Sequence, residues 1–215
     1  MRIASFILAA AVAAAAPPAA ASPVLFDDGW REQKFSLFSS NSYRRDGDSL
    51  AIRSDGTVSL LWKALPSGFW QGRTASWRWR VDETVPPTDL TRKGGDDRNI
   101  SLYFVFLPPE QAAAAAGKSI RALLDAPEAR VLMYVWGGAH DPGEILPSPY
   151  VGPRGRSVIR RAAGTGTAAE RVDLARDHRR AFGSAPGSLV GIAVSSDSDD
   201  SGTRVVARLS GLRIE

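Results

Sequence analysis

The 215-residue sequence predicts a mostly β protein, an antiparallel β-sandwich with one or two short peripheral helices. Three observations lead to this prediction. Residues 74–82 alternate strictly between apolar and polar side chains, which is typical of a strand with one buried face. Similar short runs recur at sandwich-like spacing, separated by Gly, Pro and Asp. Strands do not alternate with longer helices, so a parallel sheet flanked by helices is not expected.

The N-terminal half contains several apolar or alternating runs. They predict strands over residues 24–26, 49–53, 58–62, 74–82 and 100–107, with an irregular stretch at 35–43. Asp55-Gly56 lies between the second and third of these strands. A turn dipeptide in that place favours a β-hairpin.

The C-terminal half predicts further strands over residues 131–136, 158–162, 188–195 and 203–214. Residues 110–124 are rich in Ala and favour a surface helix, the alternative being a low-complexity insertion. Residues 140–155 are rich in Pro and Gly and predict a long loop. A second helix is expected over 171–182, where Leu174, His178, Ala181 and Phe182 recur at helical spacing, and Gly183 follows as its C-cap.

The N-terminus has the pattern of a signal peptide. Arg2 precedes an apolar run over residues 3–16, and small residues follow up to Ala21. The run is shorter than the ~20 apolar residues that span a membrane, although a retained anchor is the alternative. We therefore expect a signal peptide at residues 1–21 and a single β-sandwich domain at 22–215, periplasmic or secreted, with no transmembrane segment after cleavage.

Composition excludes several classes of function. The chain has no Cys, so thiol catalysis and Cys-based metal sites are ruled out. The net charge of +4 comes mostly from Arg, but these residues are interleaved with Asp and Glu. This is typical of a solvated surface and not of nucleic-acid binding. Gly164-Thr165-Gly166 lacks the Lys of a phosphate-binding loop, and no G-x-G-x-x-G occurs, so no nucleotide cofactor is expected.

The strand 74–82 suggests a ligand-binding face. Arg78 and Arg80 share its polar side, and two planar guanidinium groups on one sheet face suit carboxylates or sugar hydroxyls. Nearby acids and aromatic rings would complete a carbohydrate platform. The predicted ligand-binding set is Arg78, Arg80, Asp96, Asp97, Tyr103, Tyr134 and Trp136. The alternative is that the Trp side chains fill the core and the arginines form salt bridges.

The acidic turn at residues 197–202 suggests a metal site. Alternating oxygen ligands followed by Gly are typical of Ca²⁺ loops, which makes Asp197 and Asp199 candidate ligands. The helix–loop–helix version fails, because its twelfth position falls on Arg208. Two alternatives remain, a surface turn that satisfies its own backbone and a buried Asp paired with an Arg. No other cofactor is expected.

Hydrolysis is the main alternative to non-catalytic binding. Asp96, Asp97, Asp197 and Asp199 could supply the carboxylate pair that a glycosidase needs. A catalytic Ser is not supported, since no G-x-S-x-G occurs and the only two His residues are far apart in the sequence.

Five segments, in order, resemble the DUF3047 family, and together they cover most of residues 22–215. The resemblance lies in Trp77-Arg78-Trp79-Arg80-Val81, Gly95-Asp96-Asp97 with Tyr103, Val105 and Phe106, Met133-Tyr134-Val135-Trp136-Gly137, residues 170–183, and Gly191-Ile192-Ala193-Val194 with Asp197-Ser198-Asp199. It departs from the family at His178, where a Tyr is expected, and at residues 200–203, where the turn is longer. The family comprises exported bacterial proteins without an established function, so the resemblance implies a β-sandwich and an exported location but no activity.

These observations together predict a jelly-roll sandwich of the galactose-binding-like type that binds a ligand without catalysis. The expected ligand is a glycan or another component of the cell envelope. A hydrolase on the same scaffold and a protein-partner module are the alternatives.

Overall fold

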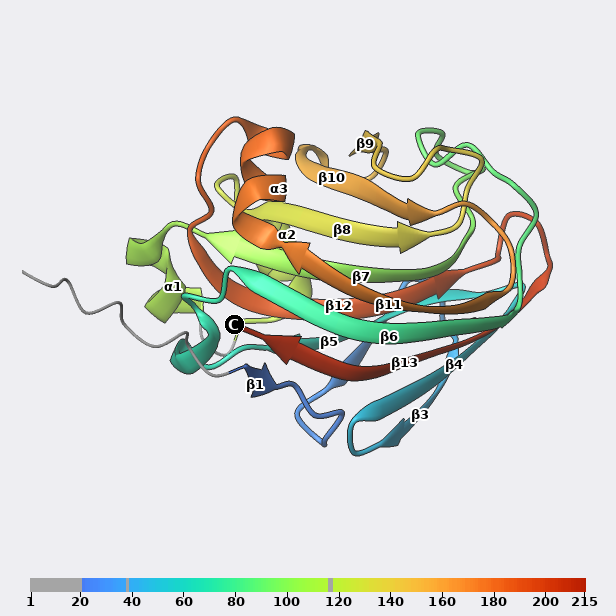
Figure 1. The fold of residues 1–215 in the computed structure, drawn as a ribbon, viewed down its shortest axis with the longest axis horizontal. Coiled ribbons are helices and arrows are strands. Elements are labelled where there is room, and N and C mark those ends of the chain that lie inside the picture. Colours follow the sequence, from blue (N-terminus) through green and yellow to red (C-terminus); the bar gives the residue numbers. More distant parts are fainter. Residues whose placement is uncertain (1–20, 38, 116–117) are drawn as a thin grey trace, which may run out of the picture.

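The computed structural model describes residues 21–215 apart from residues 38 and 116–117. The predicted signal peptide therefore lies almost wholly outside the described residues. Two sheets face each other across one core (Figure 1). This confirms the predicted mostly β sandwich with short peripheral helices. In the part of the chain that is described, no helix is long and apolar enough to cross a membrane.

The first sheet, sheet A, has strand order β11-β6-β13-β4-β3, and β1 also pairs with β13. All its pairs are antiparallel. Its strands are β1 (Ser22–Pro23), β3 (Ser42–Asp46), β4 (Ser49–Asp55), β6 (Thr74–Glu83), β11 (Gly166–Asp173) and β13 (Arg204–Ile214).

The second sheet, sheet B, has strand order β2-β5-β12-β7-β8-β10-β9. Its strands are β2 (Arg31–Lys34), β5 (Val58–Ala64), β7 (Arg98–Leu107), β8 (Arg130–Trp136), β9 (Ile145–Ser148), β10 (Gly152–Arg161) and β12 (Ser188–Asp197). One pair, β8 with β10, is parallel, which the sequence did not predict. Parallel neighbours need a crossover connection, and here the crossover contains β9 and the turn at Tyr150.

The core between the sheets is aromatic. Trp77 and Trp79 of β6 point inward, and their ring centroids lie 5.5 Å from Tyr134 and 5.8 Å from Trp136, respectively. Phe104 of β7 joins them. Alternation on β6 therefore buries both Trp side chains and leaves Arg78 and Arg80 on the outer face of sheet A, as its period of two requires.

Sheet B is covered on its outer face too. A second apolar cluster there includes Val105 of β7, Val131 and Met133 of β8, and residues of α1 (Pro109–Ala115) and α2 (Ile120–Asp125). These helices stand in the Ala-rich segment that favoured one surface helix. Ser119 caps α2, since its hydroxyl accepts a hydrogen bond from the Ala122 amide at 3.2 Å.

One predicted connection is wrong, and one predicted helix is present but begins three residues later than expected. Asp55-Gly56 does not close a hairpin, because β4 belongs to sheet A and β5 to sheet B, and the turn carries the chain between the sheets. The helix expected over 171–182 is α3 (Leu174–Phe182), because residues 171–173 end β11. Asp173 begins α3 by accepting a hydrogen bond from the Arg176 amide at 2.8 Å, and Gly183 ends it with a φ of 75°.

The strand β11 was not predicted. Its inward positions are Ala168, Glu170 and Val172, and a Glu there breaks the apolar alternation. Glu170 is buried because Arg160 and Arg161 of β10 reach it at 2.7 Å and 3.3 Å. These ion pairs join the edge of sheet A to sheet B.

Candidate functional site

A partly enclosed cavity lies on the outer face of sheet B and has a volume of about 350 Å³. Aliphatic side chains from four strands and α2 form most of its wall: Val58, Leu60, Val105, Ile120, Leu124, Val131, Met133 and Ala193. Phe35, Tyr103 and Tyr150 add three aromatic rings. This volume is within the range of pockets that hold small molecules.

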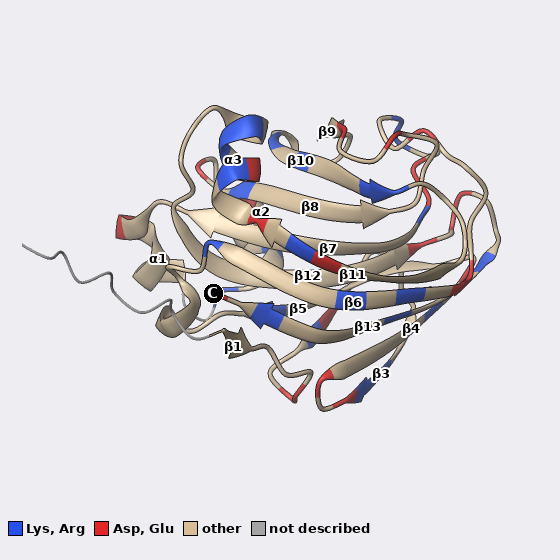
Figure 2. Ribbon diagram, viewed as in Figure 1, with Lys and Arg blue, Asp and Glu red and all other residues tan. Residues whose placement is uncertain are grey.

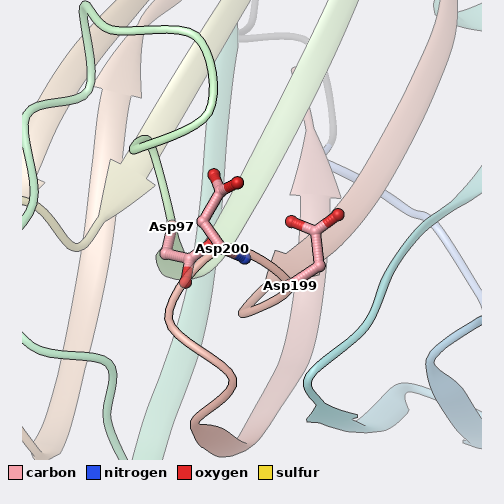
Figure 3. Close-up of side chains that lie close together, drawn as sticks. All are labelled: Asp97, Asp199 and Asp200. Atoms are coloured by element: carbon pink, nitrogen blue, oxygen red, sulfur yellow. The ribbon is translucent and has the colours of Figure 1, made fainter.

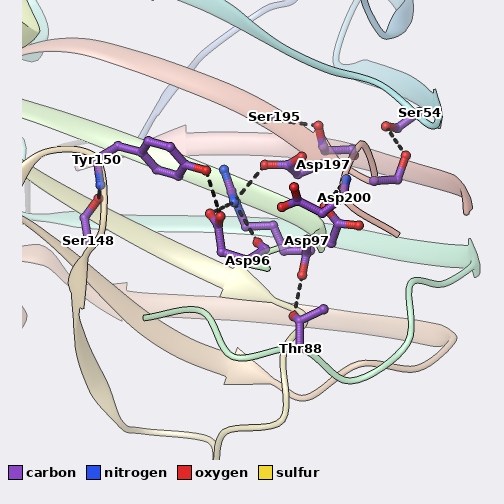
Figure 4. Close-up of polar contacts among 12 residues, drawn as sticks. Ser54, Thr88, Asp96, Asp97, Ser148, Tyr150, Ser195, Asp197 and Asp200 are labelled. Atoms are coloured by element: carbon purple, nitrogen blue, oxygen red, sulfur yellow. Dashed lines mark hydrogen bonds and ion pairs between the residues drawn. The ribbon is translucent and has the colours of Figure 1, made fainter. Parts of the chain in front are cut away.

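The polar groups of this cavity gather around one buried arginine, Arg98 at the start of β7. Its Nη1 lies 2.9 Å from Asp96 Oδ2 and 3.0 Å from Asp197 Oδ2. Its Nη2 donates a hydrogen bond to the Tyr103 hydroxyl at 3.1 Å. Tyr150 donates to the other oxygen of Asp96 at 2.8 Å (Figure 4). Four side chains therefore converge on or beside one guanidinium. We call Asp96, Arg98, Tyr103, Tyr150 and Asp197 the arginine cluster.

A β-bulge turns Arg98 toward the cavity. In the ladder between β12 and β7, Ser195 pairs with Ser101 and Asp197 pairs with Arg98. Between these two pairs β7 has two residues and β12 has one, so β7 contains one extra residue. The extra residue places Arg98 on the same face as Tyr103. On β12, Ala193, Ser195 and Asp197 reach the cavity by simple alternation.

Gly137 packs closely against the backbone of the bulge at Arg98 and Asn99. It follows β8 with a φ of 151°, and a Cβ built there would lie 2.9 Å from the Cα of Arg98. Only Gly permits this approach, so the M-Y-V-W-G segment ends in Gly for a physical reason.

The cluster has too little positive charge for its acids. Burial raises the pKa of Asp197 and outweighs the attraction of Arg98. Together with the neighbouring Asp199 and Asp96, burial brings this pKa to about 8. Burial alone would lower the pKa of Arg98, but Tyr103, Asp197 and Asp96 raise it above its usual value. One guanidinium is shared by two carboxylates, so Asp197 tends to keep its proton.

Asp197 also has an unsatisfied oxygen. Its Oδ1 is enclosed and has no hydrogen-bond donor among the described residues. The other oxygen of Asp197 and both oxygens of Asp96 are occupied by Arg98 and Tyr150. The cavity therefore contains one buried acceptor without a partner.

Of the two predicted calcium ligands, Asp199 belongs to a group of three acids and Asp197 does not. Asp97, Asp199 and Asp200 form this group, with oxygens within 4.8 Å of one another (Figure 3). However, the two oxygens of Asp97 accept hydrogen bonds from the amides of Asp200 at 3.3 Å and Ser201 at 2.7 Å, so Asp97 supports the turn after β12. For Asp197, the alternative of a buried Asp paired with an Arg is confirmed. The structure does not test calcium binding itself.

The structure does not bring the predicted ligand-binding set together. Arg78 and Arg80 lie on the outer face of sheet A, where Arg80 pairs with Asp82 of its own strand at 2.6 Å. Figure 2 shows basic and acidic segments interleaved along the strands of sheet A. Tyr134 and Trp136 are wholly buried between the sheets, so the prediction that they stack on a ligand beside Arg78 is wrong. The alternative, in which the Trp side chains fill the core, is confirmed.

Of the predicted residues, Asp96, Tyr103, Asp197 and Asp199 do line one cavity, and Asp97 lies directly behind them. Arg98 and Tyr150 were missed. Arg98 could have been noticed as a charge directly before the apolar strand 100–107. Tyr150 is the one aromatic residue in the Pro- and Gly-rich segment 140–155, and only the crossover brings it to the cavity.

Comparisons with solved structures give similarities at low sequence identity. The structure is similar to the xyloglucanase domain of NopAA, a type three effector from Sinorhizobium fredii in complex with cellobiose, with a TM-score of 0.48 and 8% identity, covering 88% of this chain and 94% of that one. It is also similar to a loop-swap mutant of Necallimastix patriciarum Xyn11A, with a TM-score of 0.45, 11% identity and coverage of 91% and 94%. The K1 cleaved adhesin domain of Lys-gingipain from Porphyromonas gingivalis W83 has a TM-score of 0.37, 11% identity and coverage of 88% and 92%.

No curated protein sequence matches the chain. One family model does match, over residues 28–213, and it is described as a protein of unknown function. This range spans both sheets, the arginine cluster and the three helices, and it agrees with the resemblance of the five sequence segments. The chain belongs to the DUF3047 family.

Proposed function

We propose that the protein is an exported, non-catalytic binding module that holds a small amphiphilic component of the cell envelope in the cavity on sheet B. The observation that carries this proposal is the division of the cavity into an aliphatic floor and one polar end. A ligand would place its apolar body on the floor and its polar head at the arginine cluster. Such a pocket, apolar with a few convergent polar groups, is the usual form of a small-molecule site.

The expected glycan enters this proposal as the head group of a glycolipid or alkyl glycoside. A longer sugar chain would need hydrogen-bonding side chains along its length, whereas the charged groups here gather around Arg98 and most of the remaining lining is apolar. Tyr150 is 56% exposed and Phe35 59% exposed, so two aromatic rings at the cavity can stack on a sugar or cover an alkyl chain.

The test is binding of N-phenyl-1-naphthylamine, a neutral dye that fluoresces in apolar sites, followed by displacement with envelope lipids and glycolipids. Ala193 forms part of the floor, so Ala193→Leu should fill the cavity and weaken dye binding at least about tenfold. The matched control is Ala51→Leu on β4, a half-buried position outside the cavity lining. Equal dye binding by both variants would refute the proposal.

The face that the sequence favoured provides a second control. Arg78→Ala and Arg80→Ala should leave dye and glycolipid binding unchanged, because both side chains lie on the other sheet. Loss of binding in either variant would mean that the binding site lies on sheet A.

Hydrolysis is a second candidate, favoured by one observation. Asp96 and Asp197 each lie about 3 Å from Arg98 Nη1, so their nearest oxygens are within about 6 Å, and burial raises the pKa of Asp197. A pair of nearby carboxyl groups, one of them with a raised pKa, is an arrangement that glycosidases use. Against it, Arg98 and Tyr150 occupy both oxygens of Asp96. Release of nitrophenol from a panel of nitrophenyl glycosides, lost in Asp197→Asn, would favour the hydrolase over the binding module.

A further inference from the structure

The charges that line the cavity are unbalanced. Its lining contains three carboxylates, Asp96, Asp197 and Asp199, and one cation, Arg98. Asp97 and Asp200 lie directly behind and add to the negative side, and burial raises the pKa of Asp200, with Asp199 and Asp97 raising it further. Lys93 is not part of the lining, and its Nζ lies 5.5 Å from the ring centroid of Tyr150. The polar end is therefore acidic.

The hydrogen bonds of the arginine cluster leave one acceptor open. Arg98 donates to Asp96 and Tyr103 and is ion-paired with Asp197, so its guanidinium is engaged by protein groups and has little left for an anionic ligand. Asp197 is more than nine-tenths buried, lines the cavity, and lacks a donor for Oδ1. An unpaired buried acceptor is unfavourable, and a donor brought by a ligand would remove that penalty.

We infer that the cavity selects an amphiphile whose head is a protonated amine, with the ammonium group donating to Asp197 Oδ1 and its apolar body on the aliphatic floor. This inference rests on the proposed function and names the ligand class of the same cavity. An ammonium group has three donors and no acceptor, which suits a site whose charged end holds three carboxyl groups. Its charge would favour release of the proton that Asp197 otherwise tends to keep. It also supplies the positive charge that the cluster lacks.

The same geometry argues against the other simple head groups. A carboxylate head would meet three acids and an engaged arginine. A hydroxyl head could donate one hydrogen bond to Asp197 but would leave the charge unbalanced. Hydrogen bonds that involve an ionised donor and acceptor are roughly twice as strong as neutral ones, so the amine should bind most tightly.

The experiment uses four ligands with the same eight-carbon tail and different heads: octylamine, 1-octanol, octyl β-glucoside and octanoate. Each is titrated calorimetrically into the purified protein below its micelle concentration. Octylamine should bind about tenfold or more tightly than octanol and octyl glucoside, and octanoate most weakly. The Asp197→Asn variant should bring octylamine to the level of octanol while changing octanol binding little.

Two further variants separate a lost contact from a damaged fold. Asp82→Asn removes an acid on the outer face of sheet A, paired with Arg80, and should change no affinity. Asp199→Asn removes the exposed acid of the cavity and should weaken octylamine alone, by less than Asp197→Asn does. It keeps the inference testable if Asp197→Asn fails to fold.

The outcomes are distinct. Octyl glucoside or octanol binding as tightly as octylamine would overturn the amine head and leave the cavity as a binding site. Tightest binding of octanoate would show that Arg98 is free for anions and would equally overturn the inference. If none of the four ligands bound and N-phenyl-1-naphthylamine did not bind either, the proposed function itself would fail.

Discussion

The outer faces of the two sheets both present arginine next to acids, yet the two settings differ. On sheet A, Arg80 is 61% exposed by its side chain and pairs with Asp82 of the same strand. On sheet B, the side chain of Arg98 is 13% exposed and contacts Asp96 and Tyr103, which are near it in the sequence, and Asp197, which is far from it. An exposed pair contributes little to stability because water screens it, whereas a buried arginine shared by two acids is tightly constrained. Alternation in sequence detects the first kind of arginine and not the second.

The largest expected difference between the faces comes from removing each arginine. Arg98→Met leaves Asp96 and Asp197 without a cation and should lower the free energy of unfolding by about 3–5 kcal/mol. Arg80→Met should lower it by less than about 1 kcal/mol. Urea denaturation of both variants measures this. Equal losses of unfolding free energy would mean that the buried Arg98 stabilises the fold no more than the exposed Arg80 does.

A smaller effect is expected from the residue that holds the bulge. Gly137→Ala places a methyl group against the backbone of Arg98 and should destabilise the fold by about 1–3 kcal/mol while weakening dye binding. Gly143→Ala is the matched control, since Gly143 also has a positive φ, 96°, but no atom lies within 4 Å of its built Cβ. It should strain the backbone without affecting the cavity. Retained binding in Gly137→Ala would show that the position of Arg98 does not matter.

The pH dependence of stability tests Asp197. In the unfolded chain this carboxyl titrates near ~3.9, whereas in the fold burial raises its pKa to about 8. Between these values the folded state binds more protons than the unfolded state, so this group makes stability fall as the pH rises. The melting temperature of Asp197→Asn should therefore fall less between pH 5 and pH 9 than that of the parent protein.

The control for the pH experiment is Asp82→Asn, which should follow the parent profile. The pKa of the buried His178 is lowered by burial, but this residue is the same in all three proteins, so its contribution cancels in the comparison. Parallel profiles for Asp197→Asn and the parent would contradict the assignment.

The smallest expected effect concerns calcium. Asp97 is committed to the turn amides and Asp197 to Arg98, which leaves Asp199 and Asp200 as exposed acids. We expect the same melting temperature with millimolar Ca²⁺ and with chelator. A rise with Ca²⁺ would assign the acidic turn to the metal, because a ligand that binds only the folded state must stabilise it.

The sequence predicted those parts of the fold that follow from local patterns. Alternation at residues 74–82 was enough to bury Trp77 and Trp79, and helical spacing was enough to place Leu174 and His178 on the inner side of α3. Prediction from the sequence failed where the burial of a side chain depends on partners from another strand. Glu170 reads as a surface residue until Arg160 and Arg161 are brought to it, and so β11 was missed.

The candidate site shows the same division. Asp96, Asp197 and Asp199 were identified as acids of interest, but their meeting depends on the β12–β7 register and its bulge. Tyr134 and Trp136 were assigned to the wrong side of the sheet, since β8 is apolar on both faces and its sequence does not say which face meets the core. A strand buried on both sides has no polar face to mark the outside.

The parallel pair of β8 and β10 has a consequence for how this family could diversify. Because parallel neighbours cannot be joined by a tight turn, the chain must make an excursion between them, and that excursion carries Tyr150 to the cavity. The sandwich itself is fixed by its aromatic core, which does not include this segment. Exchange of the crossover between relatives would therefore change which head groups are admitted while the frame stays the same.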